Sequence, residues 1–350
     1  MAFPTDPHIE SIYKRLKDAG VDRDFVRARL LPDWWDDEIL NSRSGVAMFE
    51  TYVARMTGLA IDALASAKPL TLKPAVPVTY KRRDGTQDSD VAPAAAIAEQ
   101  VGKALVTATE GVPVFKGVCS AREARESILS RQRKTVNLEA LIDFAWDRGI
   151  ANGHMAQLPA LSAKFQGIAM FAGERPVALI GDGTDSPPKL AFDLAHEIGH
   201  ILLGHTRAGE EALADIGDRS KSKQLQAPEI AEGMTPKIYE KDPIEAEADR
   251  FALELLTGHP APKLKAVYGM TGEKLAQAVS KLGPEQGIDP GVYALVYGYA
   301  AERFGVAQRA LENMGMTSGG HKAFAEGVRS RLRGDLPETQ QMLIDMLLTA

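Results

Sequence analysis

Three residues of this chain have the types and spacing of a metal-dependent hydrolase site: His196, Glu197 and His200 form a His-Glu-x-x-His pattern. Residues four apart lie on one face of an α-helix, so the two imidazoles can bind one Zn²⁺ ion. Glu197 lies beside such an ion and can accept a proton from a metal-bound water. Apolar neighbours such as Ile198 predict a buried helix, where unpartnered polar groups are unfavourable. We expect a metal site here; the alternative is a pair of core histidines with other partners.

A hydrolytic zinc site needs a third protein ligand and an open position for water. Cys119 is the single cysteine and has no ligand motif around it, so the third ligand is expected in the acidic segment 242–256. Helical spacing places Glu245 on a face of small and apolar residues, which packs inward. Glu247 shares a polar face with Arg250. Glu245 is therefore the predicted third ligand.

Three further polar residues are predicted to lie near the ligands. Asp249, one turn after Glu245, can accept a hydrogen bond from a ligand imidazole and fix its tautomer; the alternative is a contact within its own helix. Glu247 is expected to pair with Arg250 or to contact a ligand without binding the metal. His205 is about 500° further round the helix than His200, so it is predicted to lie off the ligand face, near the helix end.

Two helices must position these residues, and both have start signals. Ser186 and Pro187 fit the N-cap and first position of a helix that continues over 189–203. Asp242 and the proline after it open a second helix over 243–257, with a glutamate three residues after the cap. Together these helices would carry every predicted ligand.

A β-hairpin is predicted just before the first of these helices. The apolar runs 167–171 and 176–180 flank a short turn containing Gly173. We expect strand 176–180 to have an exposed edge on which an extended peptide can pair. The polar segment 206–241 has little periodicity and is predicted to be an insertion beside the cleft.

Composition restricts the function classes. Of 350 residues, 45% are hydrophobic and 25% charged, as in ordinary globular proteins, which excludes a mainly disordered chain. The net charge is −6, whereas nucleic-acid binders are usually basic. One cysteine excludes an internal disulfide and suits a reducing compartment. We see no signal peptide and no membrane span, and we expect a cytoplasmic protein.

Two motifs resemble those of a known family. The run 188–200 resembles the Phe-x-x-Ala-His-Glu-x-x-His helix of the ImmA/IrrE family of zinc metallopeptidases. The segment that begins Glu245-x-x-x-Asp249 is similar to that family's second helix, Glu-x-x-x-Asn/Asp-x-x-Ala, whose first Glu binds zinc. The resemblance covers about 137–257. One departure is the 45-residue spacing from His200 to Glu245, longer than compact members have.

The resemblance implies Zn²⁺ as cofactor, with His196, His200 and Glu245 as ligands and Glu197 as the base. It also implies a fold. We expect an α+β protein in which a zincin-like metallopeptidase core with a small β-sheet is flanked by helical domains. The expected segments are a helical, helix-turn-helix-like domain (1–68), a linker with helices (69–135), the zinc metallopeptidase domain (136–260) and a C-terminal helical domain (261–350).

The function that follows is a regulatory zinc-dependent endopeptidase. Similar proteins often cleave helix-turn-helix transcriptional repressors in stress or mobile-element responses, so the resemblance implies a protein substrate of that kind. Two alternatives stay open: a transcriptional or protein-binding regulator with a silent metal site, and a toxin or phage-defence component.

DNA binding by the N-terminal segment is possible but disfavoured. The run 53–62 is similar to the Ala-x-x-x-Gly turn of repressor-type helix-turn-helix domains. The helix after that turn starts at Leu59 without a basic residue, and residues 1–68 carry a net charge of −2. A helical protein-docking unit fits these residues better.

Overall fold

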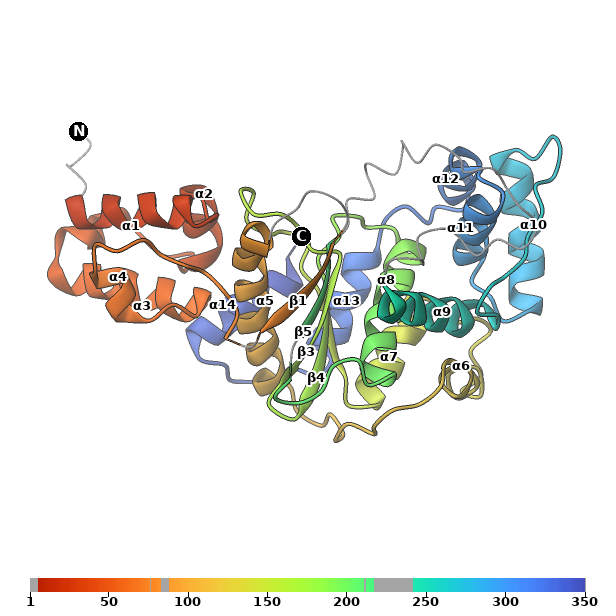
Figure 1. Ribbon diagram of the computed structural model, residues 1–350, viewed down its shortest axis with the longest axis horizontal. Coiled ribbons are helices and arrows are strands. Elements are labelled where there is room, and N and C mark those ends of the chain that lie inside the picture. Colours follow the sequence, from red (N-terminus) through yellow and green to blue (C-terminus); the bar gives the residue numbers. More distant parts are fainter. Residues whose placement is uncertain (1–5, 76, 83–87, 211, 217–241, 350) are drawn as a thin grey trace.

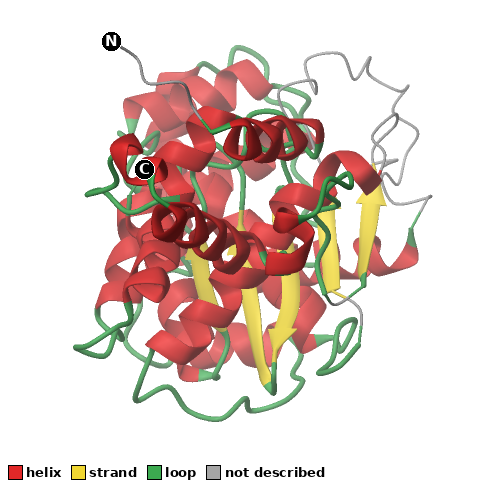
Figure 2. Ribbon diagram, turned by 90° about the vertical axis from the view of Figure 1, so that its left-hand side faces the viewer, coloured by secondary structure: helices red, strands yellow, loops and turns green. Residues whose placement is uncertain are grey.

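The computed structural model describes residues 6–75, 77–82, 88–210, 212–216 and 242–349. The fold is mixed α and β, as the sequence predicted at the level of fold class. Within those residues the strands form one five-stranded sheet, with helices on both sides (Figures 1 and 2).

The sheet has the strand order β1-β5-β3-β4-β2. Strand β3 is antiparallel to both β4 and β5, whereas β1 pairs parallel with β5 and β2 pairs parallel with β4. The strands are β1 (Val78–Arg82), β2 (Ala151–His154), β3 (Gly167–Ala172), β4 (Arg175–Ile180) and β5 (Ala212–Ile216).

The predicted hairpin is confirmed as β3 and β4, but its expected free edge is wrong. Strand β4 pairs with β3 on one side and with β2 on the other, so it offers no edge to a peptide. Strand β2 has four residues and contains Asn152 and Gly153, residue types that are depleted in strands. Strands β1 and β5 lie in segments expected to be a linker and an insertion; the rest of that insertion, 217–241, lies outside the described residues.

Helices cover both faces of the sheet (Figure 1). Helix α5 (Asp88–Ala108) packs on one face, against β3 and β4. Helix α8 (Pro187–Leu202) packs on the same two strands from the other side, next to α7 (Leu138–Asp147) and α13 (Gly320–Arg329). The sheet therefore supports α8, which carries the His-Glu-x-x-His pattern, through β3 and β4.

Helix α9 (Pro243–Thr257) crosses α8, and α6 (Ala121–Leu129) packs on α9. Beyond α9, a small separate core joins three helices. They are α10 (Gly272–Glu285), α11 (Pro290–Ala300) and α12 (Phe304–Asn313).

The N-terminal unit is helical, and its last helix is short. Helix α4 spans five residues after the left-handed turn at Gly58, which leaves little length for a recognition helix in a DNA groove. The unit consists of α1 (Pro7–Asp18), α2 (Arg23–Phe25), a π-helical turn (Val26–Leu30), a 3₁₀ turn (Asp37–Asn41), α3 (Arg43–Thr57) and α4 (Ile61–Ala65).

The C-terminal helix α14 (Glu338–Leu348) packs against α5 and against α3 of the N-terminal unit. Trp34 Nε1 donates a hydrogen bond to Glu338 Oε1 at 2.6 Å, and the Tyr52 hydroxyl donates to the other carboxylate oxygen. None of the described helices is long and apolar enough to span a bilayer.

Candidate metal centre

The ligand-bearing helices begin where the sequence placed them. Ser186 precedes α8, but its hydroxyl donates to the Met316 carbonyl at 2.7 Å rather than capping the helix. Asp242 caps α9 by accepting a hydrogen bond from the Ile244 amide at 3.0 Å. Glu245, three residues after that cap, turns toward α8.

The structure brings the three predicted ligands together. His196 Nε2 lies 3.0 Å from His200 Nε2 and 3.2 Å from Glu245 Oε2. His200 Nε2 lies 3.5 Å from Glu245 Oε1. Both histidines are buried, with 5% and 1% of their surface exposed. This buried group could hold a metal ion.

The ligand spacing fits a tetrahedral ion. Ligand atoms about 2.1 Å from a tetrahedral zinc lie about 3.4 Å apart. The two Nε2 atoms are 3.0 Å apart, His196 Nε2 lies 3.2 Å from Glu245 Oε2, and His200 Nε2 lies 3.5 Å from the other oxygen, Oε1, so the group has about the size that such an ion requires. In addition, Glu245 Oε1 is buried and accepts no hydrogen bond from the described residues. A cation would satisfy this oxygen, because buried carboxylates need a partner.

Asp249 lies beside His196, in the position of a carboxylate that orients a ligand imidazole. Its Oδ1 is 2.9 Å from His196 Nδ1, the ring nitrogen that points away from the ligand group. Burial lowers the pKa of His196, but hydrogen bonds to Asp249 and Glu245 and the nearby Glu197 charge outweigh burial and raise it well above its ordinary value. Three carboxylates thus give this pocket a negative potential that favours a cation.

His205 is closer to the site than the sequence predicted. Its Nδ1 lies 3.1 Å from His200 Nδ1, and its Nε2 lies 3.1 Å from Glu247 Oε2. His205 lies past the end of α8 at Leu202 and outside the ligand group, as predicted; its contact with the Nδ1 side of His200 is what the sequence did not indicate. Glu247 contacts His205 and reaches the ligand His200 only through it, so the direct contact with a ligand that was one of its two expected roles is not observed.

Glu197 is almost fully buried, with 2% of its surface exposed, and does not belong to the ligand group. Its side chain packs directly on the backbone of Gly167 in β3. A Cβ at position 167 would lie 2.6 Å from Glu197 Cγ and closer still to the carboxylate. Glycine is therefore the residue type that, at position 167, leaves room for the side chain of the predicted base, Glu197.

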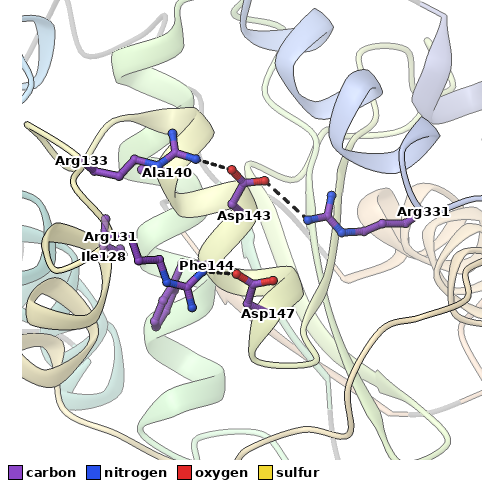
Figure 3. Close-up of a pocket in the computed structure, with 8 residues that line it drawn as sticks. All are labelled: Ile128, Arg131, Arg133, Ala140, Asp143, Phe144, Asp147 and Arg331. Carbon is purple, nitrogen blue, oxygen red and sulfur yellow. Dashed lines mark hydrogen bonds and ion pairs between the residues drawn. The ribbon is translucent and has the colours of Figure 1, made fainter.

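A separate pocket of about 250 Å³ lies between α6, α7 and the residues after α13, and contains none of the ligand group (Figure 3). Its charged lining is internally paired: Arg133 and Arg331 both bind Asp143, and Arg131 binds Asp147. Since these ion pairs satisfy its charges, this pocket is a weaker candidate for chemistry than the histidine group.

The chain was compared with protein-family models, with curated proteins and with solved structures, and no match was found in any of the three. The chemistry of this site therefore rests on its own residues.

Proposed function

We propose that this protein is a zinc-dependent endopeptidase. The observation that carries the proposal is the close group of His196, His200 and Glu245, whose ligand atoms lie within 4.8 Å of one another, with the carboxylate of Glu197 next to it in sequence. Two imidazoles and one carboxylate are a ligand set of catalytic zinc sites, which keep a further position open.

A bound Zn²⁺ would polarise the scissile carbonyl and lower the pKa of the attacking water. Glu197 then accepts a proton from that water as the oxygen attacks the carbonyl carbon. When the C–N bond breaks, the same carboxyl group passes the proton to the leaving amine. The water thus supplies a hydroxyl to the new carboxylic acid and a hydrogen to the new amine.

The proposed substrate is a protein, such as a helix-turn-helix repressor, because of the motif resemblance described above. We place the activity in the cytoplasm, since a chain with a single cysteine suits a reducing compartment. Strand β4 is paired on both sides, so the substrate binds elsewhere than along its edge.

The test compares protein N-termini in cells that produce the wild-type protein or Glu197→Gln. The substitution preserves side-chain size and removes the base, so zinc binding persists while cleavage falls by at least about 100-fold. We expect new N-termini within one or a few proteins in wild-type cells, absent with Glu197→Gln.

The control is the same substitution at Glu254, Glu254→Gln, a glutamate of α9 that lies outside the ligand group. It should give the same N-termini as the wild type. Identical N-termini from wild-type and Glu197→Gln cells would contradict the endopeptidase proposal, even if both proteins bind zinc.

A further inference from the structure

The turn that ends α8 brings His205 back over His200. Gly204 adopts a left-handed conformation with φ of 78°. The Gly204 amide bonds the Ile201 carbonyl at 3.2 Å, and the His205 amide bonds the His200 carbonyl at 2.9 Å. These two bonds form a Schellman motif, in which the residue after the glycine contacts the last full turn of the helix. Here that contact, which is usually apolar, joins two imidazoles.

The ligand geometry determines where the protons lie on these rings. His200 Nε2 points at His196 Nε2 and Glu245. A neutral imidazole that binds a metal through Nε2 carries its proton on Nδ1. His200 Nδ1 therefore donates to His205 Nδ1, across 3.1 Å. His205 must then carry its own proton on Nε2, which donates to Glu247 across 3.1 Å.

Helix α9 thus provides a carboxylate partner for each of the two ligand imidazoles. Asp249 contacts His196 directly, whereas Glu247 reaches His200 through His205. Exposure rises along the second path: the side chains of His200, His205 and Glu247 are 2%, 10% and 52% exposed. This path connects a buried ligand with the protein surface.

We propose that His205 and Glu247 are positioning residues that keep the proton of His200 on Nδ1 and so hold its Nε2 toward the metal. The inference rests on the metal site of the proposed function and assigns an outer partner to its second histidine. Carboxylates that reach a ligand histidine in this way fix its tautomer and ring orientation.

The test measures zinc affinity by chelator competition in four proteins: wild type, His205→Phe, Glu247→Ala and the double variant. Phenylalanine keeps a ring but cannot accept the hydrogen bond from His200 Nδ1, so His205→Phe should bind zinc about 10- to 100-fold more weakly. Glu247→Ala should weaken binding to a smaller extent, and it should add nothing in the His205→Phe background, because the two residues act as one path.

Two controls separate positioning from damage to the fold. Glu254→Ala, on α9 but outside this path, should bind zinc as the wild type does. The urea midpoint of metal-free His205→Phe should stay close to that of the wild type; a parallel loss of stability would indicate a structural role and overturn the inference.

A spectroscopic measurement needs no variant at this position. In the zinc-loaded wild type with ¹⁵N-labelled histidine, NMR should show His200 protonated on Nδ1 and His205 on Nε2. Either ring in the opposite tautomer, or His205→Phe with unchanged zinc affinity, would overturn the inference while leaving the metal site intact. A wild-type protein that binds no zinc would overturn both.

Discussion

At the scale of single residues, the position of Glu197 depends on Gly167. The two residues are 30 positions apart in sequence, and nothing local in either segment indicates the contact. Because Gly167 has no side chain, the Glu197 carboxylate can lie against the β3 backbone. The β3 backbone at Gly167 therefore limits where the carboxylate of the proposed base, Glu197, can lie between α8 and the sheet.

Gly167→Ala should displace Glu197 and leave the ligand group in place. A misplacement of about 1 Å can lower a rate by about 100-fold, so we expect a loss of that order in proteolysis with zinc affinity unchanged. Gly183→Ala is the matched control, since a Cβ at that position meets nothing within 4 Å. Equal cleavage rates in the two variants would show that Glu197 does not act from its observed position.

The sequence identified the ligand group through two helical patterns. His196 and His200 are four residues apart, and Glu245 could be chosen over Glu247 by the face on which it lies. Both are local arguments and need no knowledge of the tertiary fold. The His205 contact could not be found in this way, although Gly204 before it is a signal for a helix end that reverses the chain.

At the scale of elements, Arg125 of α6 fixes the far end of α9. Its guanidinium, in a side chain that is 9% exposed, donates to the carbonyls of Leu255 and Leu256 at 3.0 and 2.9 Å. It also donates to the Gln286 and Gly287 carbonyls, after α10. A cation at a helix C-terminus is favourable, and this one holds α9 against its neighbours.

Arg125→Met should lower the free energy of unfolding by about 2–4 kcal/mol, because it leaves buried carbonyl groups without donors. Urea denaturation measures the change. Arg122→Met on the same helix removes an exposed arginine that pairs with Glu126 and should have little effect. Equal midpoints for the two variants would show that Arg125 does not stabilise the end of α9.

An element could be predicted from the sequence when the residues that determine it lie within or next to it. Helices α8 and α9 and the hairpin β3–β4 have caps, prolines and a glycine turn within a few residues, so the sequence revealed them. Strand β1 pairs with β5 across more than 130 positions, and β5 also pairs with β3, so these two strands depend on partners that are distant in the sequence. Intrinsic β-propensity is a weak signal without the neighbouring strand.

At the scale of the whole molecule, α13 joins the sheet through two buried histidines. His154 in β2 donates from Nε2 to the Asp182 carbonyl at 2.7 Å, and its Nδ1 lies 3.3 Å from His321 Nδ1. Asp185 accepts from the His321 amide at 2.8 Å. This junction lies directly before α8, so it links the C-terminal helices to the helix with the proposed ligands.

Burial lowers the pKa of His154, although the charges of Asp182 and Asp185 oppose this effect. Burial also lowers the pKa of His321, where the charge of Arg329 adds to the lowering and that of Asp185 opposes it. Below about pH 6.5 these two histidines bind protons more readily in the unfolded chain than in the folded protein. The free energy of unfolding therefore decreases as the pH falls.

His321→Phe should remove one such group. Between about pH 6.5 and 5, the unfolding free energy of the metal-free variant should then depend on pH less steeply, by up to about 1.4 kcal/mol per pH unit. His259→Phe removes an exposed histidine and serves as the control. Parallel curves for wild type and His321→Phe would contradict the assignment.

The central claim is that His196, His200 and Glu245 bind one metal ion. The most direct measurement is the metal content of the purified protein by mass spectrometry, beside His196→Ala and Glu245→Ala. We predict about one zinc per chain in the wild type and loss of zinc in both variants. No metal in the wild type under metal-replete conditions, or full zinc content in Glu245→Ala, would contradict the account.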